Sequence, residues 1–357
     1  MPNENPDQNP LREIGEDSLI EKMNAWLHEK RGEKTQSPPW ARMKAVAEIG
    51  DDCALVDLAD GAARLALTTD MLVEGWHFLP DHPPERLGMK AAHANLSDLA
   101  AAGAWPMWIL VSFGAPADTP VEWVQSLYRG MARALEPYGA LCLGGDCVGA
   151  EKITINIVAG GHCNPAVKPP LRSKAWSGQE VYVTGYLGDS GAGFDLLQAS
   201  TSDREKNASA DADYLIEHHQ CGRARVRAGI ALAAACPDAA MMDLSDGIAA
   251  DLPRIVKESN CGFEIRANTL PLSPALKRMG AQLPKTALDY ALFGGEDFEL
   301  LFTTALPPEK WQRQVMHETG EEIHFTHIGH VTQQKGIHIL DGSERQIDLS
   351  KQSWKHF

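Results

Sequence analysis

Two aspartates, Asp243 and Asp246, stand three residues apart in the segment MMDLSDGIAADL, directly after an apolar stretch. An ionised carboxylate that leaves water is strongly destabilising unless it is paired or binds a metal ion. Ser245 or Asp246 could instead cap a helix beginning near Gly247, because Ser and Asp accept hydrogen bonds from the free N–H groups of a first turn. Capping leaves Asp243 unexplained, so the choice between a helix cap and a metal ligand depends on which other residues of the chain could share the site.

Further acids recur at the ends of apolar runs along the whole chain. They are Asp51, Asp52, Asp70, Asp98, Asp146, Glu296 and Asp297. Each alone is explained as a cap, a turn residue or a surface acid, but strand ends in α/β folds commonly converge on one cleft. Converging carboxylates repel one another unless hard cations offset their charge. Oxygen ligands without a nearby His or Cys cluster favour Mg²⁺ over zinc, so the sequence predicts a site for several magnesium ions.

Glycines stand beside two of these acids, in GGD (144–146) and GGED (294–297). They would let the backbone approach a bulky anion closely, because glycine lacks a Cβ. The chain has no G-x-x-x-x-G-K-[ST] motif, which excludes a Walker-type nucleotide site. The segment TGYLGDSGAGF (184–194) fits either a tight turn packed against a helix or a phosphate-binding loop.

Few basic residues accompany these motifs: Lys90, Arg129 and Arg172 are the candidates. For Arg172 the alternative to a ligand contact is a solvated charge in a loop. For His77, which stands beside aromatic residues, it is a packed, hydrogen-bonded side chain. Trp354 near the C-terminus is either a packing anchor or a stacking surface for a flat ligand.

Apolar periodicity predicts alternating helices and strands, and therefore an α/β or α+β fold in two lobes. Helices are expected at 18–30, 87–103 and 121–139, strands at 53–58, 64–70, 107–114, 140–146, 152–161 and 181–185, and a polar surface loop at 200–213. We expect a disordered acidic extension over 1–15, an N-terminal ATP- and Mg-binding α/β domain over 16–165, and a C-terminal α+β domain over 166–357. The segment 95–98 resembles 243–246, which weakly indicates a duplication.

The composition is that of an ordinary globular protein, with 44% hydrophobic and 23% charged residues among 357. The net charge of −15 argues against binding to nucleic acid or to an anionic membrane surface. The seven cysteines form no C-x-x-C pair, which argues against a disulfide framework or a zinc site and favours the reducing cytoplasm. The most apolar run, AWPMWILVSFGA, is too short to span a membrane, and the N-terminus does not resemble a signal peptide.

Seven motifs resemble those of the thiamine-monophosphate kinase family, in order and spacing. They are IGDDCALVD, LTTDMLVEGWHF, NLSDLAAAGA, LGGDCVG, VYVTGYLGDSGAG, MDLSDGIAADL and FGGEDFELLF. The resemblance implies the two-lobe fold of the wider aminoimidazole ribonucleotide synthetase-like group, whose N-terminal lobe builds a barrel in a homodimer. It also implies ATP and several Mg²⁺ ions in the cleft, and conversion of thiamine monophosphate to thiamine diphosphate by direct in-line transfer.

The resemblance also implies roles for individual residues. The implied magnesium ligands are Asp52, Thr68, Thr69, Asp70, Asp98, Asp146, Asp243 and Asp246. The implied ATP contacts are Gly145, Asp146, Arg172 and Ser245, with either Tyr128 or Arg129 near a further one. The implied contacts to thiamine monophosphate are His77, Glu296 and Trp354. No side chain is expected to act as a catalytic base, because the acceptor phosphate is already largely ionised at neutral pH.

Two other classes of function remain open. One is another ATP-using enzyme of the same superfamily, resembling selenophosphate synthetase or a hydrogenase-maturation dehydratase. The first would need a reactive Cys near a Lys, and Cys53 has no Lys following it; the second would need a C-terminal Cys, where this sequence has His356 and Phe357. The other class is a non-catalytic Mg²⁺- or nucleotide-binding module.

Overall fold

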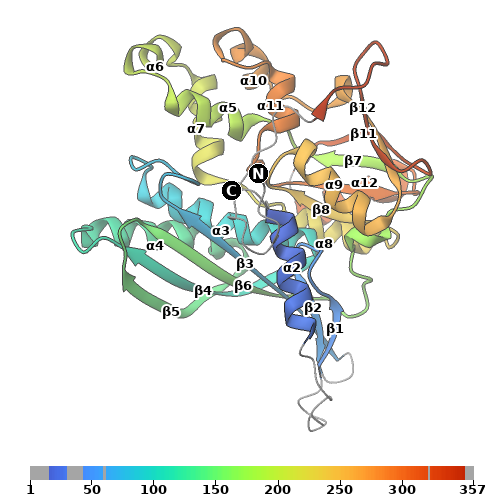
Figure 1. Ribbon diagram of the computed structural model, residues 1–357, viewed down its shortest axis with the longest axis horizontal. Coiled ribbons are helices and arrows are strands. Elements are labelled where there is room, and N and C mark those ends of the chain that lie inside the picture. The colour runs from blue at the N-terminus through green and yellow to red at the C-terminus, as the bar shows by residue number, and fades with distance from the viewer. Residues whose placement is uncertain (1–15, 30–42, 59–61, 321, 350–357) are drawn as a thin grey trace, which may run out of the picture.

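The computed structural model describes residues 16–29, 43–58, 62–320 and 322–349. Two lobes, each built on a six-stranded sheet, meet along helix α3 (Pro84–Ala101), as Figure 1 shows. This is the two-lobe arrangement that the alternating sequence pattern predicted. Within the described residues, no helix is both long and apolar enough to cross a membrane.

The N-terminal sheet has the strand order β1-β2-β3-β6-β4-β5, with all neighbours antiparallel except the parallel pair β4 and β5. Its strands are β1 (Met43–Ala47), β2 (Ala54–Leu58), β3 (Ala63–Val73), β4 (Ala104–Ala115), β5 (Leu141–Gly149) and β6 (Thr154–Cys163). In β6 the alternate residues Ile155, Ile157 and Ala159 are buried, as the period of two in a strand requires. They pack in one core with α3 and α4 (Val121–Leu135).

The C-terminal sheet has the order β12-β9-β11-β7-β10-β8 and is buried on both faces. Its strands are β7 (Glu180–Thr184), β8 (Met241–Leu244), β9 (Gly262–Arg266), β10 (Glu299–Thr304), β11 (Phe325–Thr332) and β12 (Gly336–Leu340). Along β10, Leu300 and Phe302 join the core that reaches the N-terminal lobe, whereas Leu301 joins a separate core on the other face. The first core therefore runs through both lobes.

The remaining helices cover the sheets or stand beside them. They are α2 (Glu16–Glu29), α5 (Asp189–Gln198), α6 (Thr201–Asn207), α7 (Ala210–Cys221), α8 (Val226–Ala235), α9 (Ile248–Ser259), α10 (Pro274–Met279), α11 (Ala287–Phe293) and α12 (Pro308–Thr319). Short 3₁₀ turns are η4 (Glu136–Tyr138), η5 (Arg172–Lys174), η6 (Ala267–Thr269) and η7 (Gly280–Gln282). Helices α5, α7, α10 and α11 share a small third core.

The predicted helices and strands are confirmed, but the predicted loop at 200–213 is wrong. That segment forms α6 and the start of α7. Ser200 and Ser209 are the N-caps, accepting hydrogen bonds from the backbone N–H groups of Asp203 and Ala212. Several of the polar residues that suggested a loop are therefore caps and first-turn acids.

Two acids expected at strand ends lie inside strands instead. Strand β3 continues three residues beyond Asp70, to Val73, and β5 continues beyond Asp146 to Gly149. The surroundings of these two acids therefore depend on the face of the strand from which each side chain projects, and not on a position at the strand end.

Candidate active site

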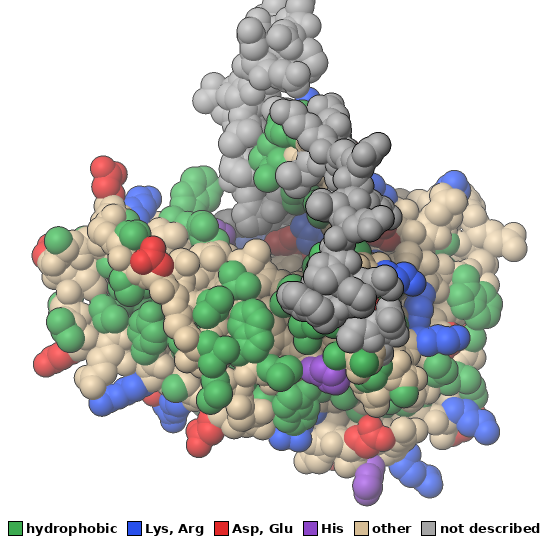
Figure 2. All heavy atoms as spheres, turned by 90° about the horizontal axis from the view of Figure 1, so that it is seen from below, with side chains coloured by type: hydrophobic (Ala, Val, Ile, Leu, Met, Phe, Trp, Pro, Cys, Tyr) green, Lys and Arg blue, Asp and Glu red, His purple; other side chains and the backbone are tan. Residues whose placement is uncertain are grey.

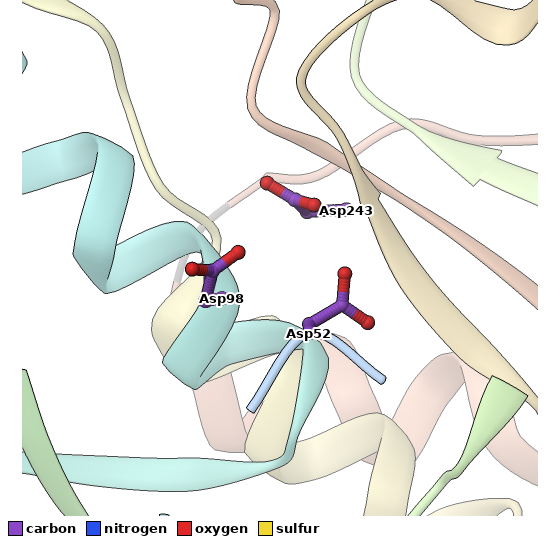
Figure 3. A group of neighbouring side chains, drawn as sticks. All are labelled: Asp52, Asp98 and Asp243. Atoms are coloured by element: carbon purple, nitrogen blue, oxygen red, sulfur yellow. The ribbon is translucent and has the colours of Figure 1, made fainter. Parts of the chain in front are cut away.

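Three carboxylates from distant parts of the chain converge between the lobes. Asp52 precedes β2, Asp98 lies in α3, and Asp243 lies in β8. One oxygen from each lies within 4.8 Å of the others, and the three side chains point toward a common space (Figure 3). The structure thus brings together three of the eight predicted magnesium ligands as a set.

Two hydroxyl groups are hydrogen-bonded to this cluster. Thr68 Oγ1 donates to Asp98 Oδ2 at 2.5 Å, and Ser97 Oγ donates to Asp243 Oδ2 at 2.7 Å. Thr68 is itself a predicted ligand. Asp70, another predicted ligand, lies on the same side of β3 as Thr68, and its charge acts on Asp98.

The cluster carries more negative charge than its surroundings offset. Burial raises the pKa of Asp98 well above its usual range, and the charges of Asp70, Asp243 and Asp52 raise it further. Burial likewise raises the pKa of Asp243, with Asp52 adding to the effect and the Ser97 hydroxyl opposing it. A set of buried, mutually repelling oxygen donors is the environment that a hard divalent cation stabilises.

Arg172 is not a solvated loop charge, because it is only 9% exposed. Its guanidinium binds both carboxylate oxygens of Asp52, at 2.5 and 3.3 Å, and donates to the carbonyl of Gly50 at 3.2 Å. Its backbone N–H donates to Asp51. Burial raises the pKa of the Asp51 carboxyl to about 6, against the opposing effect of this backbone hydrogen bond. Arg172 therefore stands at the edge of the cluster, and its predicted ATP contact stays a prediction.

The capping role considered for Ser245 or Asp246 is wrong. The N-cap of α9 is Gly247, and no side chain caps this helix. Asp246 instead forms an ion pair with Arg254 at 2.7 Å, and its backbone N–H donates to the buried Asp251. Arg254 also binds Asp251 at 2.8 Å, so one guanidinium holds two carboxylates beside the cluster.

A cavity of about 570 Å³ opens beside the cluster. Four residues with predicted ligand roles line it: His77, Ser245, Asp246 and Glu296. Its other walls are largely aromatic or acidic and include Trp76, Phe194, Asp195, Asp289, Tyr290 and Phe293. A cavity of this size suits a small organic ligand.

Hydrogen bonds fix both the His77 ring and the Glu296 loop. His77 Nδ1 accepts from the backbone N–H of Val73 at 3.0 Å, so the ring hydrogen of the neutral form is on Nε2. Glu296 has a φ of 64°, an uncommon value for a residue with a side chain. Its N–H donates to the carbonyl of Ser245 at 2.7 Å. His77 is thus both a packed side chain and a cavity residue.

Some predicted site residues do not reach the cluster in this single chain. Thr69 points to the opposite side of β3, where its hydroxyl donates to Asn156. Gly145 and Asp146 lie on β5, three strands away from β3, or about 14 Å at the usual strand spacing. Trp354 lies outside the described residues. The roles predicted for these four remain predictions.

The glycines beside the acids have structural reasons. A Cβ on Gly145 would lie 1.7 Å from the carbonyl oxygen of Val111 on β4, and one on Gly295 would lie 2.6 Å from that of Ser245. Close backbone packing alone therefore requires glycine at both positions.

The glycine-rich segment 184–194 forms a tight turn into α5. The carboxylate of Asp297 accepts from the backbone N–H groups of Gly188 and Ser190, at 2.7 and 3.2 Å. The first turn of α5 is thus occupied by a group of this chain, which favours the turn over a phosphate-binding loop.

Several cavity residues gave no signal in the sequence. Asp195 accepts from the Tyr290 hydroxyl at 2.7 Å and pairs with Lys285 at 3.0 Å. The Lys285 ammonium also lies 5.4 Å from the centre of the Tyr290 ring. These residues come from α5, α11 and the loop before it, so only the packing of those elements brings them together. For Arg254, the one available signal was its spacing of three from Asp251 on a helix.

Comparison with known proteins agrees with this geometry. The chain matches the family of AIR synthase related proteins, with the N-terminal domain over residues 50–163 and the C-terminal domain over 177–341. It therefore belongs to the AIR synthase related family.

Within that family the chain belongs with the thiamine-monophosphate kinases. The enzyme of that name from Aquifex aeolicus is 35% identical over 97% of this chain and 99% of the relative. The one from Escherichia coli strain K12 is 39% identical over 89% of this chain and 94% of the relative. A solved structure described as AaThiL complexed with AMPPCP and TMP superposes with a TM-score of 0.81 at 33% identity, covering 98% of this chain and 99% of that one.

Proposed function

We propose that this chain phosphorylates thiamine monophosphate to thiamine diphosphate with ATP. The observation that carries the proposal is the convergence of Asp52, Asp98 and Asp243 beside a cavity lined by His77 and Glu296. The related AaThiL structure was obtained with AMPPCP and TMP together, which supports a site for a nucleotide and an acceptor side by side.

The donor set of the cluster fits Mg²⁺. The three carboxylates and the Thr68 hydroxyl are hard oxygen donors, and burial and mutual repulsion raise the pKa values of Asp98 and Asp243. We propose that Asp52, Asp70, Asp98, Asp243 and Asp246 hold the ions, with Thr68. Bound there, Mg²⁺ would lower the repulsion between the two phosphate groups in an in-line transfer.

The acceptor brings its own nucleophile. A phosphate monoester has a second pKa of about 6 and is mostly dianionic at neutral pH, so no side chain need remove a proton. His77 is suited to a different task, since its Nδ1 already accepts from Val73 and its Nε2 carries the hydrogen. We propose that it donates a hydrogen bond to the acceptor. Glu296, on the same cavity wall, is the second acceptor contact.

The direct test compares two acceptors. With ATP and Mg²⁺, thiamine monophosphate should yield ADP and thiamine diphosphate, whereas free thiamine should yield neither ADP nor a phosphate ester. An alcohol needs a positioned base to activate it, and the cluster supplies carboxylates whose role is to bind cations. Conversion of thiamine at a comparable rate would refute the mechanism. Recovery of a His77→Ala variant at high pH would favour His77 as a base instead.

The selenophosphate synthetase-like alternative is disfavoured by the state of Cys53. This thiol is buried, and burial followed by the charges of Asp98 and Asp52 raises its pKa well above the usual value. A reactive cysteine needs the opposite, an accessible thiol with a lowered pKa.

We also propose a homodimer, with the N-terminal sheet at its interface. Every residue of β5 is exposed although the strand carries Leu141, Leu143 and Val148. Exposed apolar side chains continue onto β4, and Figure 2 shows hydrophobic side chains gathered on the face seen from below. An exposed apolar edge strand favours pairing with another chain. Since Asp146 and Gly145 lie on β5, the partner's site is where we propose that they act.

We also propose a domain boundary and a cellular compartment for this protein. We place the domain boundary near residue 165, because β6, the last strand of the N-terminal sheet, ends at Cys163 and β7 begins the other sheet at Glu180. We place the protein in the cytoplasm, because all seven cysteines are free thiols, which a reducing compartment maintains.

A further inference from the structure

Lys90 is a buried cation at the junction of the lobes. It belongs to α3 and is 1% exposed. A buried ammonium group is strongly destabilising unless it is paired and hydrogen-bonded. Its Nζ donates to Glu296 Oε2 at 2.8 Å and to the backbone carbonyl of His77 at 3.1 Å. One ammonium group therefore joins α3 to both of the loops that carry proposed acceptor contacts.

The pair leaves one carboxylate oxygen of Glu296 for a ligand. Oε2 binds Lys90 and lies 3.4 Å from His219 Nδ1. Oε1 makes no hydrogen bond with any residue that the structure describes, while the Glu296 side chain is 30% exposed and lines the cavity. Lys90 thus fixes the orientation of a carboxylate that borders the cavity.

Helix α3 sets the distance between the acceptor wall and the carboxylate cluster. Lys90 and Ser97 are seven residues apart, so they lie on the same face of the helix about 10 Å from each other. Ser97 binds Asp243 of the cluster, and Lys90 binds Glu296 of the cavity wall. One rigid element of the N-terminal lobe thereby holds both strand β8 and the Glu296 loop of the C-terminal lobe.

We propose that Lys90 is a positioning residue for the acceptor: anchored to the backbone carbonyl of His77, it orients Glu296 without itself contacting the ligand. This inference rests on the proposed function. It assigns a specificity role, because a carboxylate held at the cavity wall suits the cationic ring of the acceptor. ATP, which is anionic, gains nothing from that carboxylate.

A Lys90→Met variant separates positioning from general structural support. Methionine keeps the length and packing of the side chain and removes its charge. We expect the KM for thiamine monophosphate to rise about tenfold or more, since a hydrogen bond to a charged group contributes that order of free energy. The KM for ATP should stay within about threefold of wild type. Equal changes in both constants, or no change in either, would overturn the proposal.

Arg86→Met is the matched control. Arg86 lies one turn before Lys90 on α3 and also reaches the C-terminal lobe, where it donates to the Gln220 side chain at 2.7 Å. It does not line the cavity. Loss of this contact should leave both KM values within about threefold of wild type. A rise in the KM for the acceptor matching that of Lys90→Met would assign the effect to the lobe junction and overturn the proposal.

A double variant covers the case in which Lys90→Met alone does not fold. Lys90→Met/Glu296→Gln removes both charges together and leaves no unpaired buried ion. Because Lys90 acts through Glu296, its deficit in calorimetric binding of thiamine monophosphate should be close to that of Glu296→Gln alone. A binding deficit much larger than that of Glu296→Gln alone would overturn the positioning role. Wild-type protein that neither binds nor converts thiamine monophosphate would instead remove the proposed function.

Discussion

At the scale of single residues, Asp243 combines burial with a net negative environment. Its neighbours Asp52 and Asp98 have the same charge, and the one side chain that donates a hydrogen bond to it within the described residues is the neutral Ser97 hydroxyl. Burying such a carboxylate without a compensating positive charge destabilises the folded state. A bound cation that offsets the charge would explain why an aspartate stands at this position. Replacing Asp243 is therefore the most direct test of the metal site.

Asp243→Asn should largely abolish turnover while the protein remains folded. The amide keeps the size of the side chain and its hydrogen bond with Ser97 but removes the ligand charge, at a loss of about two to three orders of magnitude in kcat. Steady-state ADP release and circular dichroism measure the two effects. Asp118→Asn, at an exposed turn position, is the control and should change neither. Turnover of Asp243→Asn within about threefold of wild type would contradict the assignment.

Magnesium should stabilise the protein more at high pH than at low pH. The raised pKa values of Asp98 and Asp243 mean that the folded state binds protons more tightly than the unfolded state. Stability from these groups is greatest in acid and falls as pH rises above their ordinary pKa of 3.8. Bound Mg²⁺ offsets that loss, so the rise in Tm on adding Mg²⁺ should be larger at about pH 8 than at about pH 5.

Thermal unfolding with Mg²⁺ or with EDTA measures this difference. The pH dependence of the Mg²⁺ effect should shrink in Asp243→Asn, which has one fewer carboxylate in the cluster. A Tm that responds to Mg²⁺ equally at both pH values, or equally in the variant, would exclude these carboxylates as the source of the effect.

The sequence identified the members of the cluster but not their partners. Asp52, Asp98 and Asp243 could be grouped because buried acids need a common explanation. The contact between Asp246 and Arg254 could not be predicted, because eight residues and a change from loop to helix separate the two side chains. A Ser-Asp-Gly segment before a helix favours a cap on local grounds, and only the tertiary structure gives Asp246 a stronger partner.

At the scale of elements, α3 carries most of the contacts between the lobes. Besides Lys90 and Ser97, it contributes His93, whose Nδ1 accepts from the backbone N–H of Ala224 at 3.3 Å. His82, just before the helix, makes a hydrogen bond with the carbonyl of Gln220 at 2.9 Å. Both histidines therefore hold the connection between α7 and α8.

This junction should weaken in acid. Burial lowers the pKa of both His82 and His93 from 6.5 to about 4, with Lys90 adding to the effect at His82 and Arg223 at His93. The unfolded state then binds protons more readily than the folded state. Stability from these histidines is complete above about pH 6.5 and is lost as pH falls toward about 4.

His93→Asn should reduce this loss, because the Asn Oδ1 can accept from Ala224 without becoming protonated. Denaturant unfolding across that pH range should show a shallower fall in the free energy of unfolding than in wild type. His317→Asn, on the exposed side of α12, should keep the wild-type slope. An unchanged slope for His93→Asn would show that His93 titrates alike in both states.

The sequence largely predicted which segments form helices and which form strands. It did not predict that two segments of similar sequence lie in different kinds of element. The segments 95–98 and 243–246 look alike in sequence, but the first lies within α3 and the second leaves β8 toward a loop. They are nevertheless linked, because Ser97 of one binds Asp243 of the other. Similar chemistry at a shared site explains their likeness without requiring equivalent positions in two repeated halves.

At the scale of the whole molecule, the sequence predicted two lobes but not how they join. The core that contains Leu96 of α3 and Ile157 of β6 also contains Phe302 of β10 and Trp311 of α12. Such long-range packing depends on tertiary contacts that no local pattern records. The lobes are therefore expected to hold the carboxylate cluster and the cavity in a fixed relation, since a buried apolar interface resists relative motion.

A Leu143→Lys variant tests whether a second copy of the chain covers the exposed edge strand β5 in the whole molecule. Leu143 is 61% exposed on an edge strand, beside further apolar residues. If a second chain covers the strand, a charge there should be buried at the interface and should dissociate the dimer. Sedimentation at micromolar concentration should give about twice the chain mass of 38.9 kDa for wild type and the single-chain mass for the variant. Val121→Lys, at an apolar position that is 83% exposed at the start of α4, is the control and should remain dimeric.

The dissociated Leu143→Lys variant should also lose turnover, because Asp146 on the same strand lies about three strand spacings from the β3 residues of its own chain. Asp146 therefore depends on the partner chain to reach a carboxylate cluster. A wild-type monomer with full activity would refute both the interface and the role given to Asp146.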